Sequence, residues 1–250
     1  MRVETFANRK AMANAAARRF SDLAQQAVAR RGRFSVALSG GSTPLDLYRT
    51  LARAPYSNGV HWQRVHFFWG DERCVPADHP RSNYKMVRES LLKHVPVPFE
   101  QVHRIAGEAA PGDAAKAYEA GLRDFFQAGE PRFDLVLLGM GSDGHTASLL
   151  PGSKAVELEV KAAQQRWVTA NFAEKEGAWR VTLTTVPINA AAVVVFLVAG
   201  EEKASTLKAV LEGPRQPLRL PAQLIRPAKG ELIWMVDEAA AGLLAERSAV

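Results

Sequence analysis

The chain has 250 residues, of which 47% are apolar, and it carries a formal net charge of +6. This composition excludes an intrinsically disordered chain, and the length suffices for a large buried core. Because Cys74 is the only cysteine, the chain cannot form an intramolecular disulfide or a cysteine-based zinc cluster. We therefore expect a globular protein of a reducing compartment, the cytoplasm.

The positive charges are scattered along the chain, with short clusters only at residues 18–19 and 30–33. Proteins that bind nucleic acid usually concentrate basic residues in a stripe or a run. The longest apolar stretch, residues 190–200, is too short to cross a bilayer. We therefore expect no nucleic-acid partner and no membrane span, and a small anionic ligand explains the surplus charge better.

Apolar runs and capping residues predict helices and strands that alternate along the chain. The expected helices are residues 8–31, 44–53, 82–93, 111–127 and 201–211, and one after residue 236. The expected strands are residues 34–38, 65–69, 133–138, 167–172, 180–184, 193–198 and 231–236. This pattern indicates an α/β fold, a mostly parallel sheet with helices on both faces. Because no linker or repeat divides the chain, we expect a single domain over residues 1–250.

Four of the expected strands end in glycine-rich or charged turns, at residues 39–44, 70–73, 139–145 and 200–203. The carboxyl ends of neighbouring parallel strands form one edge of a sheet, and ligands bind there. If these four strands are neighbours, the sequence predicts an active site along that edge.

The first turn, Ser39-Gly40-Gly41-Ser42-Thr43, has the form of a phosphate cradle. Its glycines let the backbone approach a ligand, while its hydroxyl groups and the following helix N-terminus attract an anion. It is neither a Walker A loop nor a G-x-G-x-x-G fingerprint. A tight strand-to-helix turn without a ligand explains the same residues equally well.

The third turn places His145 just after a strand, in the stretch Gly-Met-Gly-Ser-Asp-Gly-His over residues 139–145. Its glycines leave room for a substrate beside the backbone, and a histidine can exchange protons near neutral pH. We expect His145 to act as a catalytic base, although a single histidine is more often structural. Either Asp143 or Asp71 could hold its ring and stabilise its charged form.

Three basic residues near strand ends are candidate ligands for a phosphate. Arg73 lies in the second turn, and Arg180 and Lys203 lie close to the ends of later strands. Guanidinium and ammonium groups bind phosphate, and together they could complete a clamp. Each of them alone could equally be a solvated surface charge.

We expect neither a metal nor a cofactor. The other histidines lack the spacing of metal ligands, and the chain has no H-E-x-x-H motif. Ser39 and Ser42 lie outside a G-x-S-x-G nucleophile elbow, and Cys74 has the character of a packing residue. The sequence therefore favours chemistry without a covalent intermediate.

Five motifs, in this order, resemble those of the 6-phosphogluconolactonases, a branch of the glucosamine/galactosamine-6-phosphate isomerase family. They are SGGSTP at 39–44, GDER at 70–73 with SNY at 82–84, GMGSDGHTASLLPG at 139–152, RVTL at 180–183 and GEEK at 200–203. The resemblance covers nearly the whole chain, and the histidine-containing stretch is its most specific part.

The resemblance implies a single Rossmann-like domain without a cofactor. Its reaction would be hydrolysis of 6-phospho-D-glucono-1,5-lactone to 6-phosphogluconate, in the oxidative pentose phosphate pathway. The Gly40-Gly41 loop, Arg180 and Lys203 would hold the 6-phosphate, with a contribution from Arg73. His145 would activate a water molecule, and Asp71 would line the same pocket.

Two other functions stay open at this point. The related glucosamine-6-phosphate deaminases carry a glutamate where this chain has Leu150, and an apolar side chain cannot transfer protons. A deaminase or isomerase is therefore the second hypothesis, and a non-catalytic sugar-phosphate-binding protein is the third. The sequence fits a monomer or a small homo-oligomer, and it leaves open whether residues 153–166 form a lid.

Overall fold

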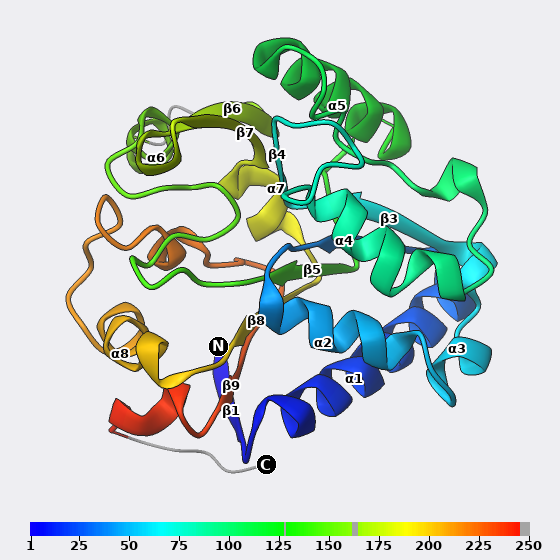
Figure 1. Ribbon diagram of the computed structural model, residues 1–250, viewed down its shortest axis with the longest axis horizontal. Coiled ribbons are helices and arrows are strands. Elements are labelled where there is room, and N and C mark those ends of the chain that lie inside the picture. Colours follow the sequence, from blue (N-terminus) through cyan, green and yellow to red (C-terminus); the bar gives the residue numbers. More distant parts are fainter. Residues whose placement is uncertain (128, 162–164, 246–250) are drawn as a thin grey trace.

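The computed structural model of the protein describes residues 1–127, 129–161 and 165–245. Among these residues, six parallel strands form the main sheet (Figure 1). In spatial order they are β1 (Arg2–Phe6), β9 (Glu231–Asp237), β8 (Val193–Val198), β5 (Leu135–Leu138), β2 (Phe34–Leu38) and β3 (Val65–Trp69). The α-helices are α1 (Arg9–Arg31), α2 (Ser42–Leu51), α3 (Tyr56–Gly59), α4 (Asn83–Ser90), α5 (Pro111–Phe125), α6 (Lys154–Val160), α7 (Thr185–Ala190) and α8 (Ala204–Leu211).

A second, antiparallel sheet lies beside the main one. Its strands, in spatial order, are β4 (Asp71–Arg73), β7 (Ala178–Leu183) and β6 (Val168–Ala173). Gly70 separates β3 from β4, and its N–H donates to the Leu38 carbonyl of β2 at 2.8 Å. The Gly70 carbonyl accepts from the Leu183 N–H of β7, also at 2.8 Å. This glycine therefore joins the two sheets at the carboxyl end of β3.

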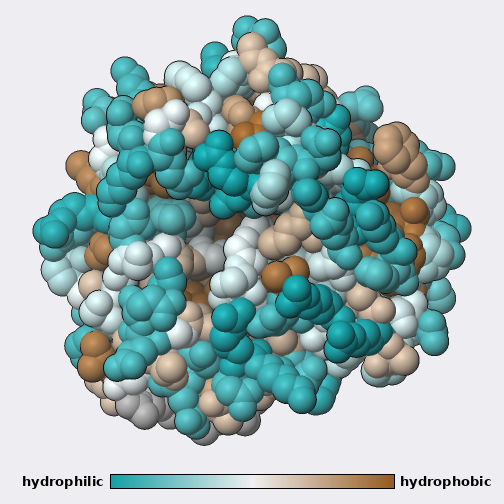
Figure 2. All heavy atoms as spheres, in the orientation of Figure 1, coloured by the Kyte–Doolittle hydropathy of each residue, from teal (hydrophilic) through white to brown (hydrophobic). Residues whose placement is uncertain are grey.

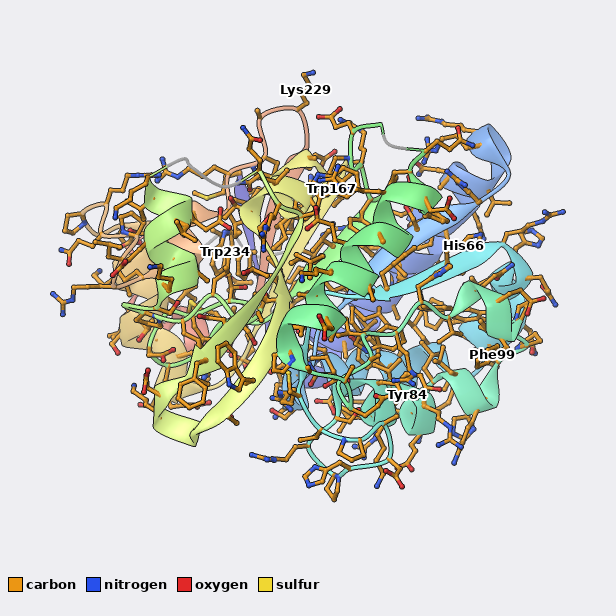
Figure 3. All side chains as sticks on the ribbon, turned by 90° about the horizontal axis from the view of Figure 1, so that it is seen from above. His66, Tyr84, Phe99, Trp167, Lys229 and Trp234 are labelled. Atoms are coloured by element: carbon orange, nitrogen blue, oxygen red, sulfur yellow. The ribbon has the colours of Figure 1, made fainter. Side chains whose placement is uncertain are left out.

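Helices cover both faces of the main sheet, as β9 illustrates. Successive residues of a strand point to opposite faces, so Ile233 lies beside residues of α1. Trp234, labelled in Figure 3, lies beside residues of α8. Trp234 also stacks on Phe196 of β8, with ring centroids 3.8 Å apart. These side chains belong to one hydrophobic core that extends into the second sheet through Val181.

The predicted fold class, an α/β fold with a mostly parallel sheet, is confirmed. The first predicted helix begins and ends as its sequence indicates. The Asn8 side chain accepts a hydrogen bond from the Ala11 N–H, and Gly32 ends the helix with a φ of 72°. A left-handed residue at this position is favourable for glycine, which lacks a Cβ atom.

Several single elements differ from the prediction. β1 was not expected, because the short segment RVETF has no continuous apolar run. Residues 167–172 and 180–184 do form strands, but they pair as an antiparallel hairpin outside the main sheet. Where a helix was expected after residue 236, the described residues up to 245 form a 3₁₀ turn, Ala240–Leu243, and another 3₁₀ turn, Glu201–Lys203, precedes α8. Residues 162–164 of the possible lid lie outside the described residues.

The order of the strands brings the four predicted turns to one edge. β8, β5, β2 and β3 are consecutive neighbours, and all of them run in the same direction. From β2 the chain first builds outward to β3, and β5 then pairs on the opposite side of β2. Such a reversal is where open α/β sheets form their ligand crevice. Among the described residues, no helix has both the length and the apolar character needed to span a membrane.

Candidate active site

A cleft opens at this edge, where the turns after β2, β5 and β8 meet strands β4 and β7 of the second sheet. Figure 2 shows this face of the molecule hollowed near its centre, with hydrophilic residues around the hollow. Every predicted site residue except Asp143 lines the cleft. These residues are Ser39, Gly40, Gly41, Ser42, Thr43, Asp71, Arg73, His145, Arg180 and Lys203.

The loop after β2 presents the N-terminus of α2 to the cleft. Gly41 precedes the helix with a φ of 101°, a conformation that side chains other than glycine rarely adopt. No described side chain caps this helix, so its first N–H groups are available to an anion. The Tyr48 hydroxyl fixes the start of the loop, because it donates to the Ser39 carbonyl at 2.7 Å and accepts from the Ser39 N–H at 3.1 Å.

His145 lies in a tight turn after β5. The Gly141 N–H donates to the His145 carbonyl at 2.9 Å, and the Gly144 N–H donates to the Gly141 carbonyl at 3.0 Å. His145 Nδ1 lies 2.6 Å from Asp143 Oδ1. The hydrogen bond to His145 holds the pKa of Asp143 well below its ordinary value, so this carboxyl group is ionised at neutral pH. Asp143 is therefore the carboxylate that orients the ring.

This contact determines which nitrogen of His145 can act as a base. With an ionised acceptor beside it, Nδ1 carries the proton of the neutral ring, and Nε2 keeps its lone pair. Nε2 has no hydrogen-bond partner among the described residues, and His145 lines the cleft. The ring therefore offers a free basic nitrogen to a bound molecule.

Asp71 lies deeper in the wall of the cleft and is only 5% exposed. Ser148 Oγ donates to its Oδ2 at 2.5 Å, and Asn83 Nδ2 donates to its Oδ1 at 3.2 Å. Arg180 Nη1 lies 3.7 Å from Oδ2. These described partners do not include His145, so the alternative in which Asp71 orients the catalytic ring finds no support in the geometry.

Arg73 and Arg180 face each other directly across β4 and β7, and both line the cleft. Like charges opposite each other destabilise a sheet, so this arrangement favours an anion between or beside them. The Nε atoms of both side chains are buried and have no partner among the described residues. Arg180 Nη2 forms an ion pair with Glu176, and Arg73 Nη1 donates to the Arg81 carbonyl at 2.6 Å.

Lys203 completes the set of cations at the cleft. It lies in the 3₁₀ turn after β8, and its N–H donates to the Gly200 carbonyl at 3.0 Å. Its ammonium group has no hydrogen-bond or ion-pair partner among residues 1–127, 129–161 and 165–245. The predicted basic residues therefore converge on the same cavity as the loop after β2.

Sequence reasoning assigned no role to two residues that organise the cleft. Asn83 and Ser148 both bind the carboxylate of Asp71. Each lies inside a motif that carried the resemblance, SNY at 82–84 and the long stretch at 139–152. Their positions were therefore signalled, but their contacts depend on how β4 packs against α4 and against the stretch at 139–152. No group of three or more His, Cys, Asp or Glu side chains suited to a metal ion occurs among the described residues.

The sequence profile of one protein family, described as glucosamine-6-phosphate isomerases/6-phosphogluconolactonase, matches residues 7–234. The chain belongs to this family. A 6-phosphogluconolactonase of Synechocystis is 44% identical over 219 residues, which cover 86% of each chain. One of Haemophilus influenzae is 41% identical over 209 residues, 84% of this chain and 87% of the relative.

Solved structures give the same result. The 6-phosphogluconolactonase of Trypanosoma brucei matches with a TM-score of 0.84 and 31% identity, over 97% of this chain and 98% of that one. A monomeric glucosamine-6-phosphate deaminase has a TM-score of 0.81 but only 20% identity, which shows a shared fold alone. The resemblance drawn from the five motifs to the lactonase branch of the family is confirmed.

Proposed function

We propose that the protein hydrolyses 6-phospho-D-glucono-1,5-lactone to 6-phosphogluconate, with a water molecule activated by His145. The observation that carries the proposal is the shared cleft. It combines an oriented histidine at one turn with the α2 N-terminus and several basic side chains. A phosphorylated ester that binds through its phosphate can thus present its carbonyl to His145.

The reaction needs one proton acceptor that later becomes a proton donor. His145 Nε2 takes a proton from water while the water oxygen bonds to the carbonyl carbon of the lactone. The carbonyl oxygen becomes an oxyanion. The imidazolium then gives the proton to the ring oxygen as the carbon–oxygen bond breaks, which leaves a hydroxyl on C5 and a carboxylic acid on C1. The acid loses its proton to solvent, so atoms and charge balance.

Asp143 supports both proton transfers. Its ionised carboxylate accepts from Nδ1 at 2.6 Å, so it stabilises the imidazolium that forms during attack and fixes the ring for departure of the leaving oxygen. General base catalysis of this kind contributes about 10²–10⁴-fold. No nucleophilic side chain is required, because water itself attacks the ester.

The phosphate end of the cleft provides orientation. The first N–H groups of α2 favour an anion, and Arg73 and Arg180 add guanidinium groups whose buried Nε atoms have no partner among the described residues. Lys203 adds a cation with no described partner. Binding energy from a remote phosphate can hold the reacting carbonyl in place, which raises the rate as well as the affinity.

The same cleft gives little support to a deaminase or isomerase. Those reactions require several proton transfers, and the position of the deaminase glutamate is occupied by Leu150. Ala147, and not Leu150, contributes to the lining of the cleft. The non-catalytic alternative leaves the oriented His145–Asp143 pair without a purpose.

Hydrolysis of fresh lactone tests the proposal. We expect rapid hydrolysis of 6-phosphogluconolactone above the spontaneous rate, and a kcat/KM at least about 100-fold lower for unphosphorylated gluconolactone, since several charge-assisted contacts are lost. Ammonia release from glucosamine 6-phosphate is measured in parallel and is expected to be absent. Equal rates on the two lactones would contradict the phosphate clamp, and ammonia release would favour the deaminase.

A further inference from the structure

Asn83 is a buried amide in the wall of the cleft for which the mechanism above has no use. It is the first residue of α4, is 2% exposed and lines the cleft. Its Nδ2 donates to the Asp71 carbonyl at 2.9 Å and to Asp71 Oδ1 at 3.2 Å. The reverse orientation would place Oδ1 against two acceptors, so this network fixes the amide. Oδ1 accepts no hydrogen bond from a described residue.

This unused acceptor lies directly against the phosphate loop. A Cβ atom placed on Gly40 would lie only 1.9 Å from Asn83 Oδ1, so the absence of a side chain at Gly40 makes room for the amide. On its other side, Asn83 contacts Asp71. The free oxygen is therefore held between the loop that would bind the phosphate and the wall formed by β4.

The backbone of Asn83 is as firmly held as its side chain. Glu72 accepts from the Asn83 N–H and the Tyr84 N–H, each at 2.8 Å, and from Ser82 Oγ at 3.0 Å. A carboxylate is favourable at a helix N-terminus, and Glu72 is itself 2% exposed. Because strand residues alternate, β4 directs Asp71 toward the cleft and Glu72 toward α4. Two adjacent carboxylates thus preorganise one acceptor.

We propose that Asn83 determines substrate specificity by accepting a hydrogen bond from the C4 hydroxyl of the lactone, an inference that rests on the proposed function. In that lactone, C4 is bonded to C5, which carries the phosphorylated C6. With the phosphate in the loop at Gly40, the C4 hydroxyl is the ring hydroxyl closest to the phosphate. The C2 hydroxyl belongs to the opposite end, beside the carbonyl and His145.

The expected consequence is selectivity at C4. In the C4 epimer the hydroxyl points away, and a buried acceptor without a donor costs free energy. Sites that bind a hydroxyl group in this way discriminate strongly against ligands that cannot supply it. At C2, where Asn83 makes no contact, selectivity is independent of this residue.

The test compares three 6-phospho lactones: the gluco substrate, its C4 epimer and its C2 epimer. The measured quantity is kcat/KM of the wild type and of Asn83→Leu, which keeps the volume but lacks the acceptor. We expect the variant to lose about 10- to 100-fold on the gluco lactone and much less on the C4 epimer. The ratio of kcat/KM for the gluco lactone to kcat/KM for its C4 epimer then falls toward one. The corresponding gluco-to-C2-epimer ratio stays within about twofold of the wild-type value.

Two further variants separate recognition from folding. Asn83→Ser shortens the side chain, so it removes the acceptor without introducing an apolar group and should lose C4 selectivity in the same way. Asn8→Ala removes the α1 cap, whose Oδ1 accepts from the Ala11 N–H at 2.9 Å, and Asn8 has no place in the cleft lining. It should lower the melting temperature and leave the C4 ratio unchanged.

Each outcome decides between the claims. Equal losses on all three lactones, or a collapse at C2 with C4 selectivity kept, would overturn the role of Asn83 while leaving the proposed function intact. A wild type that hydrolyses none of the lactones would overturn the proposed function, and the role of Asn83 with it.

Discussion

The two sheets contribute to the cleft in different ways. The parallel sheet supplies turns: the loop at residues 39–43 offers backbone N–H groups, and the turn at 139–145 holds His145 against Asp143. The antiparallel sheet supplies side chains, namely Asp71, Arg73 and Arg180. Proton transfer would therefore depend on the parallel sheet, whereas anion binding would draw on both sheets, so substitutions can affect the two separately.

Removal of the base should have the largest effect. We expect His145→Ala to lower kcat by about 10²–10⁴-fold, because water loses its proton acceptor, while KM changes little. Steady-state kinetics with fresh lactone measure both parameters. Full turnover by this variant would contradict the assignment of catalysis to the parallel sheet.

Substitutions of Lys203, in a turn of the parallel sheet, and Arg180, on a strand of the antiparallel sheet, should differ in their effect on the free energy of unfolding. Lys203→Met and Arg180→Met should each lower kcat/KM about 10- to 100-fold, mainly through KM, since each removes a charged contact to the phosphate. Arg180 is 5% exposed and close to Asp71, so its loss should also reduce the free energy of unfolding by about 3 kcal/mol. Lys203→Met should leave the urea unfolding curve unchanged, because its ammonium group has no described partner. Identical unfolding curves for both variants would argue against this difference.

A methyl group added at Gly141 tests whether the position of the His145 ring matters for turnover. A Cβ atom on Gly141 would lie 2.2 Å from His145 Nδ1 and 2.6 Å from Asp143 Oδ1, so the ring must move away from the carboxylate. We expect Gly141→Ala to lower kcat about 10-fold, a part of the general-base contribution. Gly121→Ala on α5 is the matched control, since its added methyl group would meet nothing within 4 Å. Similar kinetics for both variants would show that the ring needs no such support.

A smaller effect is a loss of folding stability at acid pH, which involves two histidines outside the cleft lining. His66 on β3 (Figure 3) lies with Nδ1 3.2 Å from His103 Nε2. Burial lowers the pKa of His66, with Arg33 acting in the same direction, and burial lowers the pKa of His103 from 6.5 to about 4. Both rings therefore fold in the neutral form. Their contribution to stability is complete above pH 6.5 and is lost as the pH falls toward 4.

Urea unfolding at pH 7.5 and pH 5 measures this loss. His103→Phe should reduce the difference between the two pH values, because it keeps the stack on Phe68, whose centroid lies 4.3 Å away, and removes the titrating group. The kcat measured at pH 7.5 should be the same in this variant, because neither histidine lines the cleft. An unchanged difference in unfolding would assign the acid sensitivity to other groups.

The sequence predicted the parallel half of the molecule better than the antiparallel half. Apolar runs and glycine-rich turns identify a buried strand and its carboxyl end locally, so the loop at 39–44 and the turn at 139–145 were found without a structure. β4, in contrast, is three charged residues whose strand character depends entirely on pairing with β7. The choice between Asp71 and Asp143 likewise required coordinates, because both carboxylates lie near a strand end.

The buried contacts of Asn83 and Ser148 with Asp71 could not be predicted from the sequence pattern. Asn83 and Ser148 are ordinary polar residues in the sequence, and their significance comes from contacts that span 12 and 77 positions of the chain. No local periodicity or motif spacing encodes such contacts. The resemblance to a family identified the segments, and the fold showed what their side chains contact.

The ionised Asp143 beside His145 also bears on how the cycle ends. Opening of the lactone would create a second anionic group on the ligand, beside the ring of His145 that this carboxylate contacts. Like charges at close range repel each other in a partly desolvated site. If the proposed function holds, the C1 end of the product would leave first, and the phosphate, attracted by the basic side chains, would leave last.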